Sequence, residues 1–265
     1  MLDKMVLGRY IPGNSYIHQL DPRMKFIFVF LFTIIIFLFN NWVTYAMGII
    51  ITLIIMMLAK LKLSFLINGL KPILFILLFT LLMHVFFTKG GVTLVEYKWF
   101  NIQSRGVELG IQTVLRFVII IFITTIMTLT TSPIELTDAI ESLFKPLKKL
   151  KLPVHEFALM MSISLRFIPT LMDETTRVMN AQSARGSDIQ TGSLPKRIRA
   201  LMPLLIPLFI SAFKRAEELA IAMEVRGYRG DIGRTKYKQL IWERKDTNGL
   251  LMLIPILLLT WLLRS

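Results

Sequence analysis

Five stretches of the chain are apolar enough to be considered membrane-spanning helices. A helix needs about 20 apolar residues to cross the hydrocarbon core of a bilayer. The first and last stretches are shorter, so we expect them to tilt or to extend into flanking residues. Asn40 and Asn41 predict a tight polar turn between the first two helices. The predicted spans are residues 24–39, 42–58, 72–88, 109–131 and 250–263.

The segment 132–247 has a different pattern, in which apolar residues recur at helical spacing among many charges. Ser132, Pro133 and Glu135 combine a capping serine, a proline at the first helical position and a glutamate that can reach back to the cap. They predict the start of a helix. It is expected to be amphipathic rather than membrane-spanning, with one apolar face formed by Leu136, Ile140, Leu143 and Leu147.

Two further amphipathic helices are predicted, one opening at Pro153 and one after Gly192-Ser193. Both end in an arginine followed by glycine, at Ala184-Arg185-Gly186 and at Val225-Arg226-Gly227. The two arginines lie 41 positions apart in the chain. This repetition indicates two helical units of similar construction.

These patterns predict an all-α integral membrane protein with about five transmembrane helices and a cytoplasmic module of three long amphipathic helices. The expected domains are residues 1–131 with four spans, residues 132–247 with the cytoplasmic module, and residues 248–265 with the last span. Basic residues collect in cytoplasmic segments of membrane proteins, so we expect a cytoplasmic N-terminus. The residues that set this orientation are Lys4, Arg9, Arg23, Lys25, Lys60, Lys62 and Lys71.

Composition supports a membrane protein. Of the 265 residues, 54% are hydrophobic, the mean hydropathy is +0.62 and the net charge is +14. We assign the basic charge to cytoplasmic segments and anionic lipid, not to nucleic acid. The chain has no cysteine, which excludes disulfides, thiolate catalysis and cysteine-bound metal.

The chain offers little catalytic chemistry. It lacks a glycine-rich loop ending in Gly-Lys-Ser/Thr, so ATP hydrolysis by the P-loop route would need another protein. His18, His84 and His155 are scattered and do not form the helical zinc-protease spacing, so neither metal nor catalytic residues are expected. Arg116, inside the fourth predicted span, is expected to reach the bilayer surface or to pair with Glu108.

The two arginine-glycine endings allow two interpretations. Arginine in a last turn complements the helix dipole, and glycine supplies the left-handed residue that ends many helices. Alternatively, both endings are docking tips, because small neighbours let a helix end enter a groove where a guanidinium can pair with a carboxylate. Asp188-Ile189 and Asp231-Ile232 follow the two endings at similar distances, which favours two equivalent sites.

Over essentially its whole length, the sequence resembles the transmembrane T component of energy-coupling factor (ECF) transporters. The most specific similarities are the two arginine motifs and the segment Ser15-Tyr16-Ile17-His18-Gln19-Leu20-Asp21-Pro22-Arg23-Met24-Lys25, which is similar to the family's approach to its first span. Val225 departs from the pattern, since alanine is common at this position.

The resemblance implies a noncatalytic coupling subunit of a vitamin or micronutrient importer in a prokaryotic cell membrane. Ala184, Arg185, Gly186, Val225, Arg226 and Gly227 would dock on two ABC-type ATPases, with Asp188, Arg229 and Asp231 as accessory contacts. Met160, Met161, Leu165, Phe209 and Phe213 would face a substrate-binding membrane protein, the S component. This chain would bind no cofactor, and ATP and magnesium would be bound by the ATPases.

Two other functions remain open on the residues alone. An intramembrane enzyme would depend on His84, His155 or a carboxylate and would work without ATPases. A lipid-binding membrane scaffold would depend on the total basic charge, with no special weight on Arg185 or Arg226.

Overall fold

The structure is a computed structural model that describes residues 10–97, 100–186, 194–230 and 239–263. The chain divides into two compact units. One comprises Gly8–Ala139 and Leu240–Ser265, and we call it the membrane unit. The other contains Ile140–Gln239, and we call it the long-helix unit.

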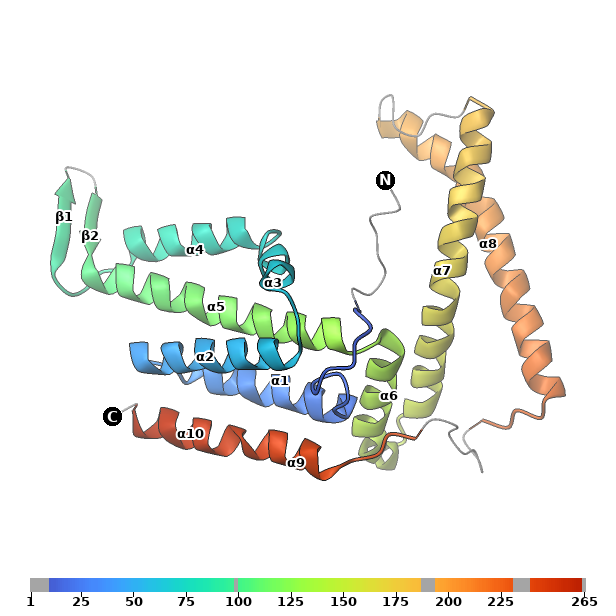
Figure 1. Cartoon of the computed structure of the whole chain (residues 1–265). Helices are drawn as coiled ribbons and strands as arrows, with labels where there is room; N and C mark the ends of the chain where they lie inside the picture. Colours follow the sequence, from blue (N-terminus) through green and yellow to red (C-terminus); the bar gives the residue numbers. More distant parts are fainter. Residues whose placement is uncertain (1–9, 98–99, 187–193, 231–238, 264–265) are drawn as a thin grey trace. The chain divides into compact units, whose positions relative to one another are not determined.

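The membrane unit is built around the helix α5, which packs against α1, α2, α3 and α4 (Figure 1). The two strands pair antiparallel as a hairpin before α5, and α9 and α10 pack on α1. The elements of this unit are α1 (Pro22–Phe37), α2 (Trp42–Leu58), α3 (Leu63–Leu70), α4 (Leu74–Phe87), β1 (Thr93–Tyr97), β2 (Phe100–Gln103), α5 (Ser104–Thr130), α9 (Arg244–Leu251) and α10 (Leu253–Leu262).

The core of the membrane unit lies where α1, α2, α5 and α10 meet. Phe32 and Ile36 of α1 and Ile119 of α5 are almost completely buried there. Gly48 of α2 is tightly enclosed, because an added Cβ would lie 2.7 Å from the Phe39 ring and 3.2 Å from Ile119. The apolar stripe of α5 and a small residue on α2 thus allow these helices to approach closely.

Helix α4 packs on α5 across two glycines one turn apart, Gly106 and Gly110. A Cβ at Gly106 would lie 2.7 Å from the carbonyl oxygen of His84 and 2.9 Å from that of Thr88. A Cβ at Gly110 would lie 2.9 Å from the Leu81 side chain. Glycines four positions apart commonly allow close packing of membrane helices, and here they bring α5 against the backbone of α4.

We expect Gly106→Ala to lower the stability of the purified protein in detergent by about 1–3 kcal/mol, since the added methyl would overlap backbone carbonyls that cannot rotate away. Thermal unfolding followed by circular dichroism measures the change. Gly69→Ala in α3 is the matched control, because its methyl would meet the Thr125 hydroxyl at 3.1 Å, and that side chain can move. Equal losses for the two variants would contradict this account of α4 packing.

Arg116 of α5 joins the ends of α1 and α2. Its Nη2 donates to the carbonyl oxygen of Phe39 at 3.2 Å and to the hydroxyl of Tyr45 at 2.9 Å, and its guanidinium lies over the Phe37 ring. The expected pairing with Glu108 is wrong, because the Glu108 carboxylate accepts instead from Gln112 at 3.3 Å. Arg116 is therefore a packing residue that satisfies a carbonyl at the end of α1.

The five predicted spans correspond to α1, α2, α4, α5 and the α9–α10 run, and α2 has the predicted ends while the others are shifted. Within the described residues, α5 and the run Arg244–Leu262 are long and apolar enough to cross a membrane, and α3 with α4 would form a third span broken by a 64° bend. Helix α2 is apolar but shorter, so five crossings remain a prediction. The short helix α3 and the β hairpin were not predicted. The last helix begins at Arg244, before the predicted start, because Asp246 accepts from the backbone N–H of Glu243 and caps a polar first turn.

The amphipathic helices begin where the sequence predicts. Helix α6 (Pro133–Phe144) has the predicted capping box, in which Ser132 N–H donates to Glu135 and Glu135 N–H donates to the Ser132 hydroxyl. This helix is 12 residues long, so the expectation of three long helices is wrong for it. Pro146 follows, and Lys145–Leu150 forms a 3₁₀ helix instead.

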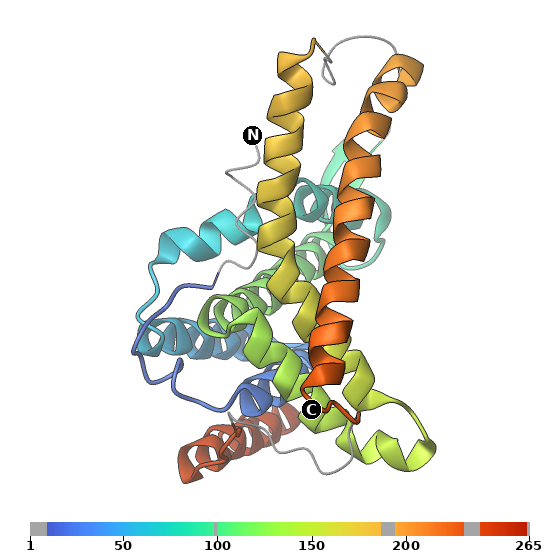
Figure 2. The same ribbon diagram turned by 90° about the vertical axis from the view of Figure 1, so that its right-hand side faces the viewer.

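In the long-helix unit, α7 (Val154–Ala184) and α8 (Leu194–Val225) lie side by side (Figure 2). Arg215 of α8 pairs with Glu174 of α7 at 2.7 Å. The facing residues, which include Phe167, Leu171 and Ala216, line a groove of about 430 Å³. Pro169, Pro203 and Pro207 lie inside these helices without ending them.

Candidate functional site

The two predicted tips have the same backbone construction. Arg185 caps α7 and Arg226 caps α8, and each is followed by a glycine in the left-handed region, with φ of 81° at Gly186 and 74° at Gly227. Such φ values strain any residue with a Cβ, so glycine is required here.

Backbone hydrogen bonds complete both helix ends. The N–H of Gly186 donates to the carbonyl of Ser183 at 3.0 Å, and that of Gly227 donates to Glu224 at 2.9 Å. In the second tip, Tyr228 N–H also donates to the carbonyl of Met223 at 3.0 Å, which completes a Schellman motif. The backbone alone therefore ends these helices, and neither arginine side chain is needed for the cap.

Both tips are exposed. All six predicted docking residues are solvent-accessible, and Val225 retains 82% of its accessible surface. A Cβ on either tip glycine would meet no atom within 4 Å. In the part of the chain that the structure describes, neither the Arg185 nor the Arg226 guanidinium has a hydrogen-bonding or ion-pair partner.

The structure does not bring the tips together. Consecutive long helices run in opposite directions, so Arg185 lies at one end of the α7–α8 pair and Arg226 at the other (Figure 2). A helix of 32 residues such as α8 is about 48 Å long at 1.5 Å per residue. The tips can therefore contact two well-separated surfaces.

The accessory residues are only partly described. Arg229 is exposed just beyond the second tip, and Gly230 after it again has a positive φ, 72°. Asp188 and Asp231 lie outside the described residues.

The predicted apolar contact residues are mostly exposed. Met160 on α7 and Phe209 and Phe213 on α8 keep 53%, 61% and 71% of their surface, Met161 is exposed, and Leu165 is half-buried. Phe209 and Phe213 lie one turn apart on α8 and are not among the residues that line the groove between α7 and α8. The α7–α8 contact thus leaves these large side chains uncovered.

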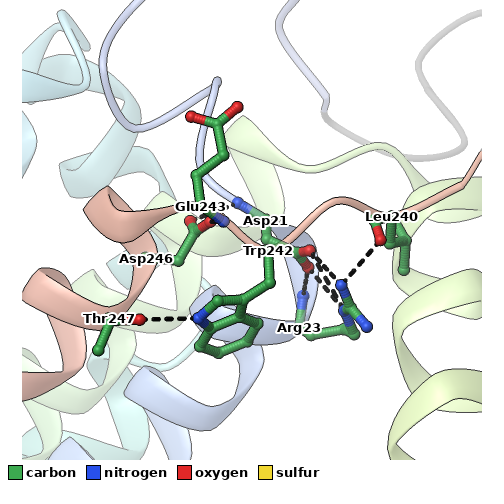
Figure 3. A network of polar contacts seen from close by, with 7 residues as sticks. All are labelled: Asp21, Arg23, Leu240, Trp242, Glu243, Asp246 and Thr247. Atoms are coloured by element: carbon green, nitrogen blue, oxygen red, sulfur yellow. Dashed lines mark hydrogen bonds and ion pairs between the residues drawn. The ribbon is translucent and has the colours of Figure 1, made fainter.

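A polar network centred on two buried aspartates joins the N-terminal segment to the last helix (Figure 3). The backbone N–H of Asp21 donates to Oδ1 of Asp246 at 2.9 Å, and both aspartates are at most 5% exposed. Arg23 donates through Nη2 to Asp21 Oδ2 at 2.7 Å and to the carbonyl of Leu240 at 3.0 Å. Its guanidinium lies over the Trp242 ring, and the indole N–H donates to Thr247 at 2.8 Å. We call this network the Asp21–Asp246 latch.

The residues on both sides of Asp21 in the chain are also fixed by polar contacts. Ser15 and His18 are hydrogen-bonded at 2.6 Å, and the other His18 nitrogen, Nε2, lies 3.0 Å from the carbonyl oxygen of Ile11. Lys25 is buried, and its ammonium donates to Thr130 O at 2.9 Å and to the Thr131 hydroxyl at 3.3 Å. The contacts of Asp21, Arg23 and Lys25 were not predicted. The signal in the sequence was the group of charged residues directly before an apolar run.

We expect Asp246→Ala to destabilise the membrane unit by about 2–6 kcal/mol, because it leaves two N–H groups, those of Asp21 and Glu243, without acceptors at about 1–3 kcal/mol each. Thermal unfolding in detergent measures this loss. Lys245→Gln, which removes only an exposed pair with Glu243, is the control and should change the transition far less. A latch variant as stable as this control would show that the latch does not hold α9 on α1.

These features define an all-helical integral membrane protein with a long-helix unit and two exposed arginine tips. Comparison with known proteins shows the same class. Residues 13–237 match the family described as cobalt transport protein (CbiQ). The chain is also similar over its full length to three energy-coupling factor transporter transmembrane proteins, EcfT. It is 68% identical to that of Macrococcus caseolyticus and 54% identical to that of Bacillus subtilis, each covered completely, and 54% identical to that of Staphylococcus aureus, of which it covers 98%.

The chain therefore belongs to the CbiQ family, as the transmembrane T component of an energy-coupling factor transporter. The resemblance found in the sequence is confirmed. Such a component works together with other subunits of its transporter.

Proposed function

We propose that this T component couples ATP hydrolysis by two ABC-type ATPase subunits to substrate release by a membrane-embedded S component. Arg185 and Arg226 are the ATPase-docking residues. ATP and magnesium bind to the ATPases, and this chain binds no cofactor. The transporter takes up a vitamin or another micronutrient, with the N-terminus of this chain in the cytoplasm.

The observation that carries this proposal is the pair of exposed, unpaired guanidinium groups on two helix ends that are each completed by a left-handed glycine, within the described residues. Since the backbone completes each cap, the side chains are available for a carboxylate on another protein. A rigid helix end also transmits a push or pull along its axis, which a flexible loop does not.

The placement of the tips supports two docking partners. Each long helix carries one tip, and the tips lie at opposite ends of the α7–α8 pair. One ATPase subunit on each tip would let a change in the distance between the subunits act on both helices. The pairing of Arg215 with Glu174 and the apolar contact between the helices would pass this movement from one helix to the other.

The uncovered apolar residues support an S component as the third partner. Phe209, Phe213 and Met160 are large, apolar and more than half exposed. Contiguous exposed apolar residues mark interaction surfaces. Methionine adapts to differently shaped partners, so this surface suits a very apolar membrane protein.

We expect Arg185→Glu and Arg226→Glu each to weaken assembly with the ATPase subunits, and the double variant to abolish it. Removing one partner from a desolvated ion pair costs about 3–5 kcal/mol. Co-purification of the ATPases with the tagged T component from membranes measures assembly, and vitamin uptake by cells measures function.

Arg177→Glu is the matched control for charge reversal, because Arg177 is exposed on α7 two turns before the first tip. It should leave assembly intact. Normal assembly and uptake by the double variant would refute the proposal, whereas equal losses in the control would favour the lipid-scaffold function, which depends on total charge.

A second prediction separates the two kinds of partner. Phe213→Ser should reduce retention of the S component while leaving the ATPases bound, because it removes apolar surface at a position away from both tips. Co-purification of both partner types in one experiment measures the split. Lys214→Ser, one position along the same helix, is the control, and loss of the ATPases with Phe213→Ser would contradict this division of surfaces.

A further inference from the structure

The membrane unit contains an apolar cleft of about 440 Å³ that none of the functions above uses. Its walls come from α1, α2, α5 and the α9–α10 run. Met24 and Phe28 of α1 and Ile123 and Met127 of α5 are among the lining residues. Polar side chains enter the lining only at Tyr16, Lys25, Thr130 and Asn248, and the rest is hydrocarbon.

The rim of the cleft is exposed and apolar. Ile54 and Leu58 of α2 are exposed on one side, and Met252, between α9 and α10, keeps 67% of its surface on the other. Helix α5 and the run Arg244–Leu262 have the length and composition of membrane spans. In a bilayer, such a rim opens the cleft to lipid hydrocarbon.

One end of the cleft is basic. Lys60 and Lys62 lie two and four positions after the last α2 residue of the rim, Leu58. Lys245 on α9 adds little net charge, because its ammonium pairs with Glu243 at 3.0 Å. Both loop lysines are exposed. Lys25 contributes only its aliphatic stem, because its ammonium is already bound by Thr130 and Thr131. An occupant should therefore be apolar along its length and anionic at one end.

Along α2 the cleft runs from Ile51 to Leu58, about 10 Å at 1.5 Å per residue. This length accommodates part of an acyl chain.

We propose that this cleft holds an acyl chain of one anionic phospholipid, whose headgroup lies against Lys60 and Lys62. The apolar walls replace contacts with neighbouring lipids, and the lysines select a negative headgroup. The Asp21–Asp246 latch fixes the basic end of the cleft, because it holds the first turn of α9 on α1. This site is independent of the arginine tips.

Native mass spectrometry of the full-length protein in mild detergent tests the proposal. The protein is titrated with phosphatidylglycerol or phosphatidylcholine carrying the same acyl chains. We expect one phosphatidylglycerol to stay bound under activation that removes phosphatidylcholine. Each lysine removed, by Lys60→Gln or Lys62→Gln, should weaken this retention by about fivefold.

Met127→Trp should fill the cleft and abolish the preferential retention. Met57→Trp is the matched control, because Met57 is 68% exposed on α2 and does not line the cleft. Thermal unfolding of both variants shows whether they fold. If Met127→Trp is unstable, the lysine variants, which change only surface charge, provide the decisive comparison.

A phosphatidylglycerol with a photoactivatable group in its acyl chain locates the site. Crosslinks to the α5 peptide that contains Ile123 and Met127 support the proposal. The proposal is overturned by equal retention of the two lipids, by unchanged retention in a folded Met127→Trp protein, or by crosslinks confined to the outer faces of α2 and α4. A dimer peak that Met127→Trp removes would assign the cleft to a second copy of the chain and would equally overturn it.

Discussion

Close contact with α5 is the constraint on which the membrane unit depends. Four helices that precede α5 in the chain pack on it, and two of these contacts need glycine. Gly106 brings α5 against the carbonyls of α4, and Gly48 lets α2 approach Ile119. In a bilayer there is little hydrophobic driving force between helices, so this closeness supplies the association energy through van der Waals contact. Arg116 adds a polar contact by satisfying a carbonyl at the end of α1.

The last helix is held in a different way. Helices α9 and α10 pack on α1, and the start of α9 is fixed by carboxylate, guanidinium and indole groups of the latch (Figure 3). Buried aspartates tolerate this position because each accepts hydrogen bonds from N–H donors. Leu240 is held as well, because its carbonyl accepts from Arg23.

The long-helix unit combines backbone-completed helix ends with uncovered side chains. Gly186 and Gly227 end the helices through their backbone conformation, so the caps do not depend on the side chains of Arg185 and Arg226. The same separation holds along the helices, where Phe167 and Ala216 serve the α7–α8 contact and Phe209 and Phe213 remain outside it. The contact between α7 and α8 thus uses a different face of α8 from the one that carries Phe209 and Phe213.

The sequence by itself determined the local features. The starts of α6, α7 and α8, the capping box at Ser132, the α1–α2 turn and the two arginine-glycine ends were predictable, because they depend on residues a few positions apart. Only the tertiary structure decided the rest. The pairing of Asp21 with Asp246, the partners of Arg116, the helix α3 and the β hairpin, and the cleft between α2 and α9–α10 could not be predicted. These features join residues as many as 225 positions apart or depend on how closely helices approach, and neither the periodicity of apolar residues nor local capping carries that information.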